Sequence, residues 1–131
     1  MNRTLLPLAV SLVLAGCTAA SDRMAGAGAG ELASTLAGRV AGAPVDCVNV
    51  QSASGSFRAI GGALLFNEGR RLYRSDPVDG CPFLANDPIV IVETYGGRIC
   101  RNDRFRTVGR GTSIPSGYCR FGAFTPYDRP R

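Results

Sequence analysis

The residues best suited to chemistry in this chain are its five cysteines, Cys17, Cys47, Cys81, Cys100 and Cys119. A thiol can accept a lipid, pair in a disulfide or ligate a metal. The last four are separated by 34, 19 and 19 residues, without the C-x2-C pairs of zinc sites or redox motifs. We therefore expect no metal site and two disulfides. Three connectivities are open, and we favour Cys47–Cys81 with Cys100–Cys119 because this pairing links neighbouring segments.

Acid-base chemistry has few candidates in this sequence. The chain contains no histidine, which removes the Ser-His and Cys-His pairs of most nucleophilic hydrolases and the commonest metal ligand. Asp103 closely follows Cys100 and is expected to cap a turn through its carboxylate; the alternative is a catalytic acid or a ligand. Glu93 follows an apolar run, and we expect it on a solvated strand edge or paired with an arginine. No cofactor is indicated.

Arginine supplies all the basic charge. The chain has 15 basic residues, none of them lysine, against 10 acidic ones, and a net charge of +5. The densest basic stretch contains Arg98, Arg101, Arg104, Arg106 and Arg110. This stretch is typical of solvated strand edges, where charge prevents edge-to-edge aggregation. The alternative is contact with an anionic lipid, lipopolysaccharide or a peptidoglycan carboxylate, with Arg98, Arg101, Arg104 and Arg106 as the candidate anion-binding residues.

The start of the chain has the organisation of an export signal. A short basic segment, 1–4, precedes an apolar run, 5–14, that is too short to span a bilayer as a mature helix. The next tetrapeptide, Leu14-Ala15-Gly16-Cys17, resembles the lipobox of bacterial lipoproteins at every position. The resemblance implies a signal peptide, residues 1–16, cleaved before Cys17, and stable anchoring by several acyl chains on Cys17. Thr18, where aspartate would signal inner-membrane retention, implies the outer membrane, facing the periplasm.

Residues 17–44 are expected to connect this anchor to a folded domain. Residues 18–30 contain an alternating Ala/Gly run and predict a flexible tether. Residues 31–40 could form a short helix, because Leu32, Leu36 and Val40 are spaced at i, i+4 and i+8 on one face. A protein anchored in the envelope does not meet nucleic acid, so we expect no nucleic-acid partner.

From residue 45 to residue 131 short apolar runs alternate with turn residues, which predicts a mainly β domain. We expect a small antiparallel meander or barrel-like sheet with two disulfides. The expected strands are 57–60, 63–67, 70–74, 89–95, 98–100, 105–108 and 118–124. The run 89–95 is apolar on both faces and predicts a central strand. A thin core at this length makes disulfides useful for stability.

Several short motifs follow one another in a recognisable order. They are Ala37–Cys47, Leu72–Arg74, Cys81–Leu84, Ile99-Cys100 followed by Asp103, and Cys119–Tyr127. In this order and spacing the chain, from about residue 36 to residue 127, resembles a family of small proteobacterial proteins of unknown function, common in sphingomonad-like genomes. The resemblance implies a shared disulfide-bonded β domain. It brings no known activity and no catalytic residues.

Two functions remain open from the sequence. The anchor and the missing catalytic constellations favour a non-enzymatic structural or binding module that contacts an envelope protein or an anionic glycan or lipid. The alternative is an enzyme or inhibitor that acts on cell-wall or lipid substrates through Asp103 or Glu93 with nearby arginine. This alternative predicts a concave pocket that holds these groups together.

Overall fold

The computed structural model describes residues 16–51 and 56–131, and for residues 16–25 it describes the backbone alone. The predicted signal peptide therefore lies outside the described residues, apart from Gly16. The described elements are α1 (Gly16–Leu36), β1 (Val40–Ala41), β2 (Cys47–Asn49), β3 (Arg58–Ile60), β4 (Ala63–Glu68), β5 (Arg71–Ser75), the short 3-10 helix η1 (Pro82–Leu84), β6 (Ile89–Val92), β7 (Arg98–Cys100), β8 (Arg104–Val108), β9 (Cys119–Arg120) and β10 (Phe124–Asp128).

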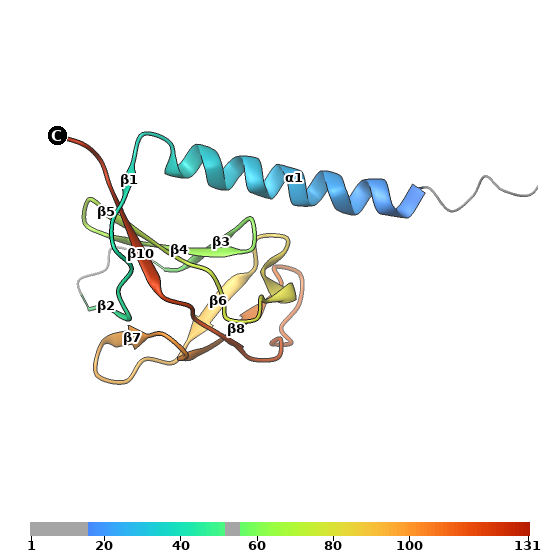
Figure 1. The fold of residues 1–131 in the computed structure, drawn as a ribbon. Coiled ribbons are helices and arrows are strands. Elements are labelled where there is room, and N and C mark those ends of the chain that lie inside the picture. Colours follow the sequence, from blue (N-terminus) through green and yellow to red (C-terminus); the bar gives the residue numbers. More distant parts are fainter. Residues whose placement is uncertain (1–15, 52–55) are drawn as a thin grey trace, which may run out of the picture.

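The strands form three antiparallel sheets (Figure 1). The largest has the order β1-β10-β5-β4-β3, the second pairs β2 with β7, and the third has the order β6-β8-β9. Strands β3, β4 and β5 are a meander of consecutive hairpins, which turn at Gly61-Gly62 and at Gly69, where positive φ angles suit glycine. The prediction of a mainly β fold with antiparallel strands is confirmed.

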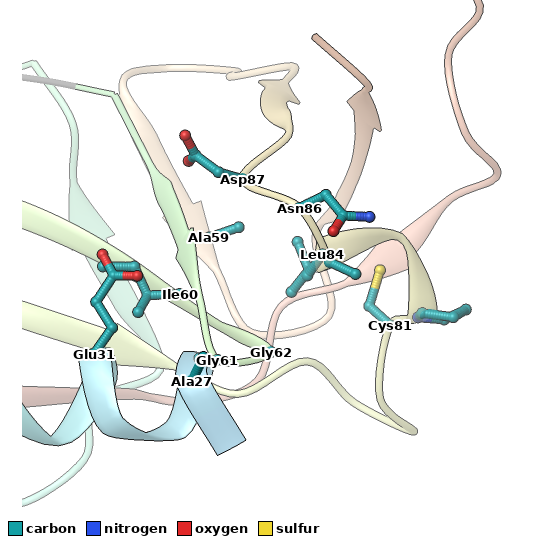
Figure 2. A pocket seen from close by; sticks show the side chains of 13 residues that line it. Ala27, Glu31, Ala59, Ile60, Gly61, Gly62, Cys81, Leu84, Asn86 and Asp87 are labelled. Carbon is teal, nitrogen blue, oxygen red and sulfur yellow. The ribbon is translucent and has the colours of Figure 1, made fainter. Parts of the chain in front are cut away.

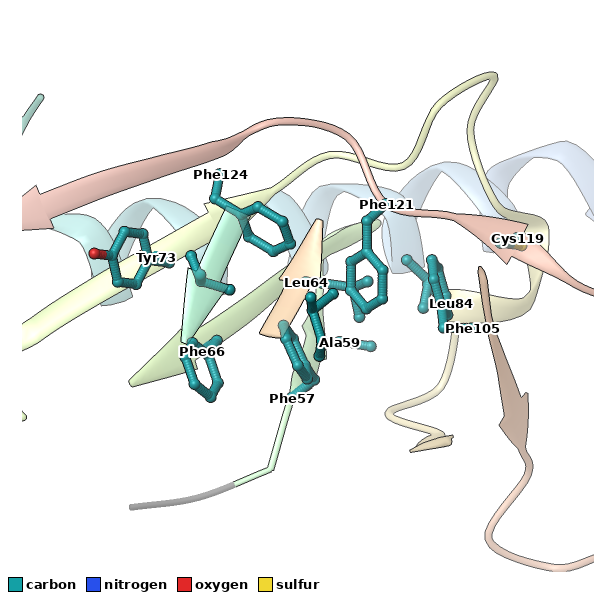
Figure 3. Close-up of a cluster of buried hydrophobic side chains, with 12 residues drawn as sticks. Phe57, Ala59, Leu64, Phe66, Tyr73, Leu84, Phe105, Cys119, Phe121 and Phe124 are labelled. Atoms are coloured by element: carbon teal, nitrogen blue, oxygen red, sulfur yellow. The ribbon is translucent and has the colours of Figure 1, made fainter. Parts of the chain in front are cut away.

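The five-stranded sheet is buried on both faces because alternate side chains of β4 enter two different clusters. Leu64 and Phe66 join the main core between the sheets, whereas Ala63 and Leu65 pack with Leu32 of α1. Figure 3 shows the main core, in which aromatic rings from different strands and connecting segments meet. The rings in contact are Phe57, Phe66, Tyr73, Phe105, Phe121 and Phe124.

The prediction that the run 89–95 is a central strand is wrong. Strand β6 covers Ile89–Val92 alone and lies at the edge of the three-stranded sheet. Val90 and Val92 pack against the main core, but the side chain of Ile89 is 50 % exposed. The strand buried on both faces is β4. An apolar run does not reveal which strands pair with it, because that pairing is set by residues distant in the sequence.

The flexible tether predicted for residues 18–30 is not what the structure has: this segment belongs to α1. The helix lies along one side of the β domain and its first turns extend past the strands (Figure 1). Alanine has the highest intrinsic helix propensity and offsets part of the cost of the glycines. The last turns of α1 then dock on the five-stranded sheet through Leu32 and Leu36, as the expected short helix would.

A pair of glycines lets α1 approach the sheet closely. A Cβ atom on Gly61 would lie 2.6 Å from the carbonyl oxygen of Gly28. Beyond Leu36 the helix ends, and Val40, predicted to lie on its apolar face, is instead an exposed residue of β1 paired with Asp128. No helix in the described part of the chain is both long and apolar enough to cross a membrane.

The four cysteines of the β domain form two disulfides, as predicted, but the favoured pairing is wrong. The bonds are Cys47–Cys100 and Cys81–Cys119. Strand β2 pairs with β7 in a register that places Cys47 directly opposite Cys100. Because β2 has three residues and no clear pattern, the sequence did not predict it, and segments adjacent in sequence looked like the natural partners.

Candidate anion-binding groove

A groove of about 470 Å³ lies where β7, the β7–β8 turn and the segment after β6 meet. The disulfide residues Cys47 and Cys100 are part of its lining. Six side chains give the groove its polar and aromatic character: Glu93, Tyr95, Arg98, Asn102, Asp103 and Arg104. Two cations and two carboxylates therefore share one concave surface.

The turn between β7 and β8 is fixed by Asp103. Its Oδ2 accepts a hydrogen bond of 2.7 Å from the backbone N–H of Cys100, and its own N–H donates 3.0 Å to the carbonyl of Cys100. Asn102 takes the left-handed conformation, with φ of 72°, that asparagine tolerates better than most residues. The prediction that Asp103 caps a turn is confirmed.

A two-residue turn sets Tyr95 beside Arg98. Gly96 and Gly97 both have positive φ, which suits a tight hairpin turn, and an antiparallel bridge joins Tyr95 to Arg98 across it. The Tyr95 side chain is 85 % exposed. The groove therefore has an aromatic side chain and a guanidinium on adjacent positions of one wall.

Arg104 and Arg106 stand two residues apart on β8 and so point to the same face of the sheet. Their guanidinium carbons lie 4.9 Å and 5.0 Å from the ring centre of Tyr118. A cation over an aromatic ring gains electrostatic attraction from the ring face. Arg106 Nη2 also lies 3.7 Å from Glu93 Oε1, which confirms the expected pairing of Glu93 with an arginine.

The four arginines predicted to bind an anion do not form one cluster. Arg98 and Arg104 line the groove. Arg106 shares the Tyr118 ring with Arg104 and lies near Glu93, but it is not itself part of the groove lining. The side chain of Arg101 is exposed on the β7–β8 turn and is not part of the groove lining.

The sequence did not single out the two tyrosines of this region. Strands β8 and β9 are antiparallel, with Phe105 opposite Cys119. The next position along this register places Tyr118 opposite Arg106. Tyr95 was expected at the end of the strand 89–95, whereas the structure places it beside the Gly96-Gly97 turn, opposite Arg98. The signal for Tyr118 lies in the β8–β9 register, which no local pattern reveals.

The two carboxylates of the groove are engaged in structural contacts. Asp103 holds the turn, and Glu93, whose side chain is 58 % exposed, lies near Arg106. The concave arrangement that the enzymatic alternative requires is present, and both of its carboxylates contact neighbouring groups.

A larger cleft of about 690 Å³ runs between α1, the β3–β4 turn and η1 (Figure 2). Its walls are mostly apolar and include Ile60 and Leu84. Glu31 and Asp87 reach its rim, and each is ion-paired with an arginine, Arg58 and Arg110 respectively. None of the arginines predicted to bind an anion lines this cleft.

Within residues 16–51 and 56–131 no group of three or more Cys, Asp or Glu side chains is arranged to hold a metal ion. Comparison of the chain with family models, with curated proteins and with solved structures gave no match. The function must therefore be argued from the chemistry of the chain itself.

Proposed function

We propose that this chain is a lipid-anchored protein of the bacterial outer membrane, facing the periplasm, whose β domain is a non-enzymatic binding module for an anionic glycan. The lipobox-like segment Leu14–Cys17 supports the anchor. Cys17 is the second residue of α1, which leads directly to the β domain. At 1.5 Å per residue, the part of α1 between Cys17 and Gly28, where the helix first contacts the β3–β4 turn, would separate the lipid from the domain by about 16 Å.

The observation that carries the binding role is the convergence of Arg98 and Arg104, from two strands, beside the exposed ring of Tyr95. A guanidinium group binds a carboxylate through two parallel hydrogen bonds, and a tyrosine ring offers an apolar face to a sugar. Glu93 and Asp103 line the same groove and would repel a multiply charged group. A singly charged carboxylate on a sugar-peptide chain, as in peptidoglycan, fits this balance of charges.

The direct test is binding of soluble peptidoglycan fragments with free carboxylates to the full mature chain in neutral detergent. Replacing both groove arginines, Arg98→Gln with Arg104→Gln, is expected to weaken binding about tenfold or more, because hydrogen bonds to charged groups are lost. Titration calorimetry measures the change in Kd.

The matched control is Arg58→Gln with Arg110→Gln, which removes the same charge from exposed ion pairs outside the groove. This control variant should bind like the parent chain. Equal weakening in both double variants would show a general charge effect and would overturn the assignment of the groove.

The enzymatic alternative keeps one supporting observation, the presence of Glu93 and Asp103 in one groove with arginine. Mass spectrometry of the same fragments after incubation decides the matter. Cleavage by the parent chain that is lost in Glu93→Gln would make the protein an enzyme. Fragments that are bound but unchanged in mass support the binding module.

The anchor is tested by Cys17→Ser. Serine cannot form the thioether to a diacylglyceryl group, so the variant is expected to keep the mass of an unacylated precursor and to leave the detergent phase. The parent chain should instead lack residues 1–16 and carry the added mass of acyl chains. Thr18→Ser, one position further, should behave like the parent. A Cys17→Ser variant with unchanged mass and partitioning would refute lipidation.

A further inference from the structure

A second groove, of about 700 Å³, is strongly basic. It lies between the end of α1 that is far from Cys17 and the C-terminal segment, two parts of the backbone that Figure 1 shows on the same side of the β domain. Three segments that are distant in the sequence form it: the connection between α1 and β1, the β4–β5 turn with the start of β5, and the end of β10 with the residues after it. Each segment brings arginine. The lining arginines are Arg39, Arg70, Arg71, Arg129 and Arg131.

The charge of this groove is not balanced by its own residues. Asp128 is the acidic side chain among the described residues that line it. Both oxygens of Asp128 are taken by Arg71, at 2.9 Å from Nε to Oδ1 and 2.9 Å from Nη2 to Oδ2. Arg71, followed more weakly by Arg39, holds the pKa of Asp128 below its usual range. Asp128 therefore neutralises one arginine and leaves the others facing a shared space.

Arg39 is held in place from two sides. Its Nη1 donates hydrogen bonds of 3.3 Å to the carbonyl of Arg70 and of 3.3 Å to the carbonyl of Tyr127. These bonds tie the end of α1 to the β4–β5 turn and to β10, and they leave Nε and Nη2 of the half-buried guanidinium for other partners. Gly69, with φ of 60°, makes the tight turn that brings Arg70 to this position.

The number of cations points to the kind of ligand. One carboxylate is satisfied by one guanidinium, as the Arg71–Asp128 pair itself demonstrates. Several guanidinium groups converging on one space repel one another unless they share an anion with more charge and more oxygen atoms. A phosphoryl group carries up to two charges and three free oxygen atoms, each of which accepts hydrogen bonds from arginine.

We propose that the groove formed by Arg39, Arg70 and Arg129 binds phosphoryl groups of the monoester type. This site is separate from the groove of Arg98 and Arg104, which we call the glycan-binding groove. A phospholipid whose headgroup is a terminal phosphate, such as phosphatidic acid, and a soluble phosphate monoester present the same chemistry. The experiment below separates these two sources.

The test uses the full mature chain in neutral detergent with inorganic pyrophosphate as the probe. Arg70→Gln with Arg129→Gln should weaken pyrophosphate binding at least about tenfold, which corresponds to the loss of about 1.4 kcal/mol. Arg39 is kept, because its hydrogen bonds also hold the fold. Binding should weaken as salt is added, since the contacts are ionic.

The matched control is Arg98→Gln with Arg104→Gln, which removes equal charge from the glycan-binding groove and should keep pyrophosphate affinity. Equal loss in both variants, or no pyrophosphate binding by the parent chain, would overturn the second site while leaving the glycan proposal intact. Displacement of pyrophosphate from the parent chain in the same detergent then identifies the source. Stronger displacement by micellar phosphatidic acid than by glycerol phosphate assigns the headgroup, and stronger displacement by glycerol phosphate assigns a soluble phosphate.

Discussion

Replacing Cys47 and Cys100 by alanine is expected to lower the free energy of unfolding by about 4 kcal/mol, the largest effect expected from removal of one bond. The disulfide joins residues 53 positions apart, and a closed loop of this length restricts the unfolded chain by roughly that amount in the chain-entropy model. The effect is a large fraction of the roughly 5–15 kcal/mol that stabilises a typical domain. Urea denaturation of both proteins measures the difference.

The same series tests the pairing of the cysteines. The Cys47→Ala, Cys100→Ala variant keeps the Cys81–Cys119 bond and should show no free thiol on maleimide labelling. A Cys47→Ala, Cys81→Ala variant breaks both bonds and should expose two reactive thiols when it is labelled as it is purified. Free thiols in the first variant and none in the second would contradict this pairing. That result would show that the bonds are Cys47–Cys81 and Cys100–Cys119 instead.

Phe121→Ala should destabilise the domain by about 3–5 kcal/mol, because it removes a large ring from a packed core and leaves a cavity. The side chain is 0 % exposed. Its ring centre lies 4.7 Å from that of Phe105, 5.1 Å from that of Phe57 and 5.6 Å from that of Phe124. Thermal and urea unfolding with circular dichroism detection measure the loss.

Phe83→Ala is the control for this variant. Phe83 loses the same ring, but its side chain is 44 % exposed, so the expected loss is below about 1.5 kcal/mol. The hydrogen bond between Thr107 Oγ1 and Phe83 uses the backbone carbonyl and survives the change. Similar losses in the two variants would mean that Phe121 is not at the centre of the core.

The strands that the sequence predicted well are those with local signals. The runs 63–67 and 98–100 correspond to β4 and β7, because each begins directly after a Gly-Gly turn. Strands β1 and β2 were missed, since two or three residues carry no periodicity. Their existence depends on partners from the far end of the chain, β10 and β7. The disulfide pairing was missed for the same reason.

The last predicted strand, 118–124, is divided in the structure. Strand β9 ends at Arg120 and β10 begins at Phe124. Between them the backbone passes so close to Asp76 that a Cβ on Gly122 would overlap the Asp76 carbonyl oxygen. The hydroxyl of Ser75 also donates a hydrogen bond of 3.1 Å to the carbonyl of Gly122. A contact of this kind joins distant backbone segments and leaves no periodic trace in the sequence.

In the candidate sites, too, the sequence predicted contacts between residues that are near in the chain but not contacts between residues that are far apart in it. Asp103 could be assigned to a turn from its neighbours alone, and the structure agrees. The meeting of Arg98 with Arg104 was expected from their closeness in sequence. The second basic groove brings Arg39 together with Arg70 and Arg129. Only the docking of α1 and the pairing of β10 with β5 place these three side chains in one groove.

The two disulfides enclose overlapping stretches of the chain, residues 47–100 and 81–119. Any single cut of the backbone between residues 47 and 119 therefore falls inside at least one closed ring, and the two pieces stay covalently joined. If the bonds were instead Cys47–Cys81 and Cys100–Cys119, residues 82–99 would lie outside both rings. A cut there would separate the N-terminal part of the chain from the C-terminal part. A protease that nicks the exposed connection after β8 would leave the domain in one covalent piece, still attached to α1.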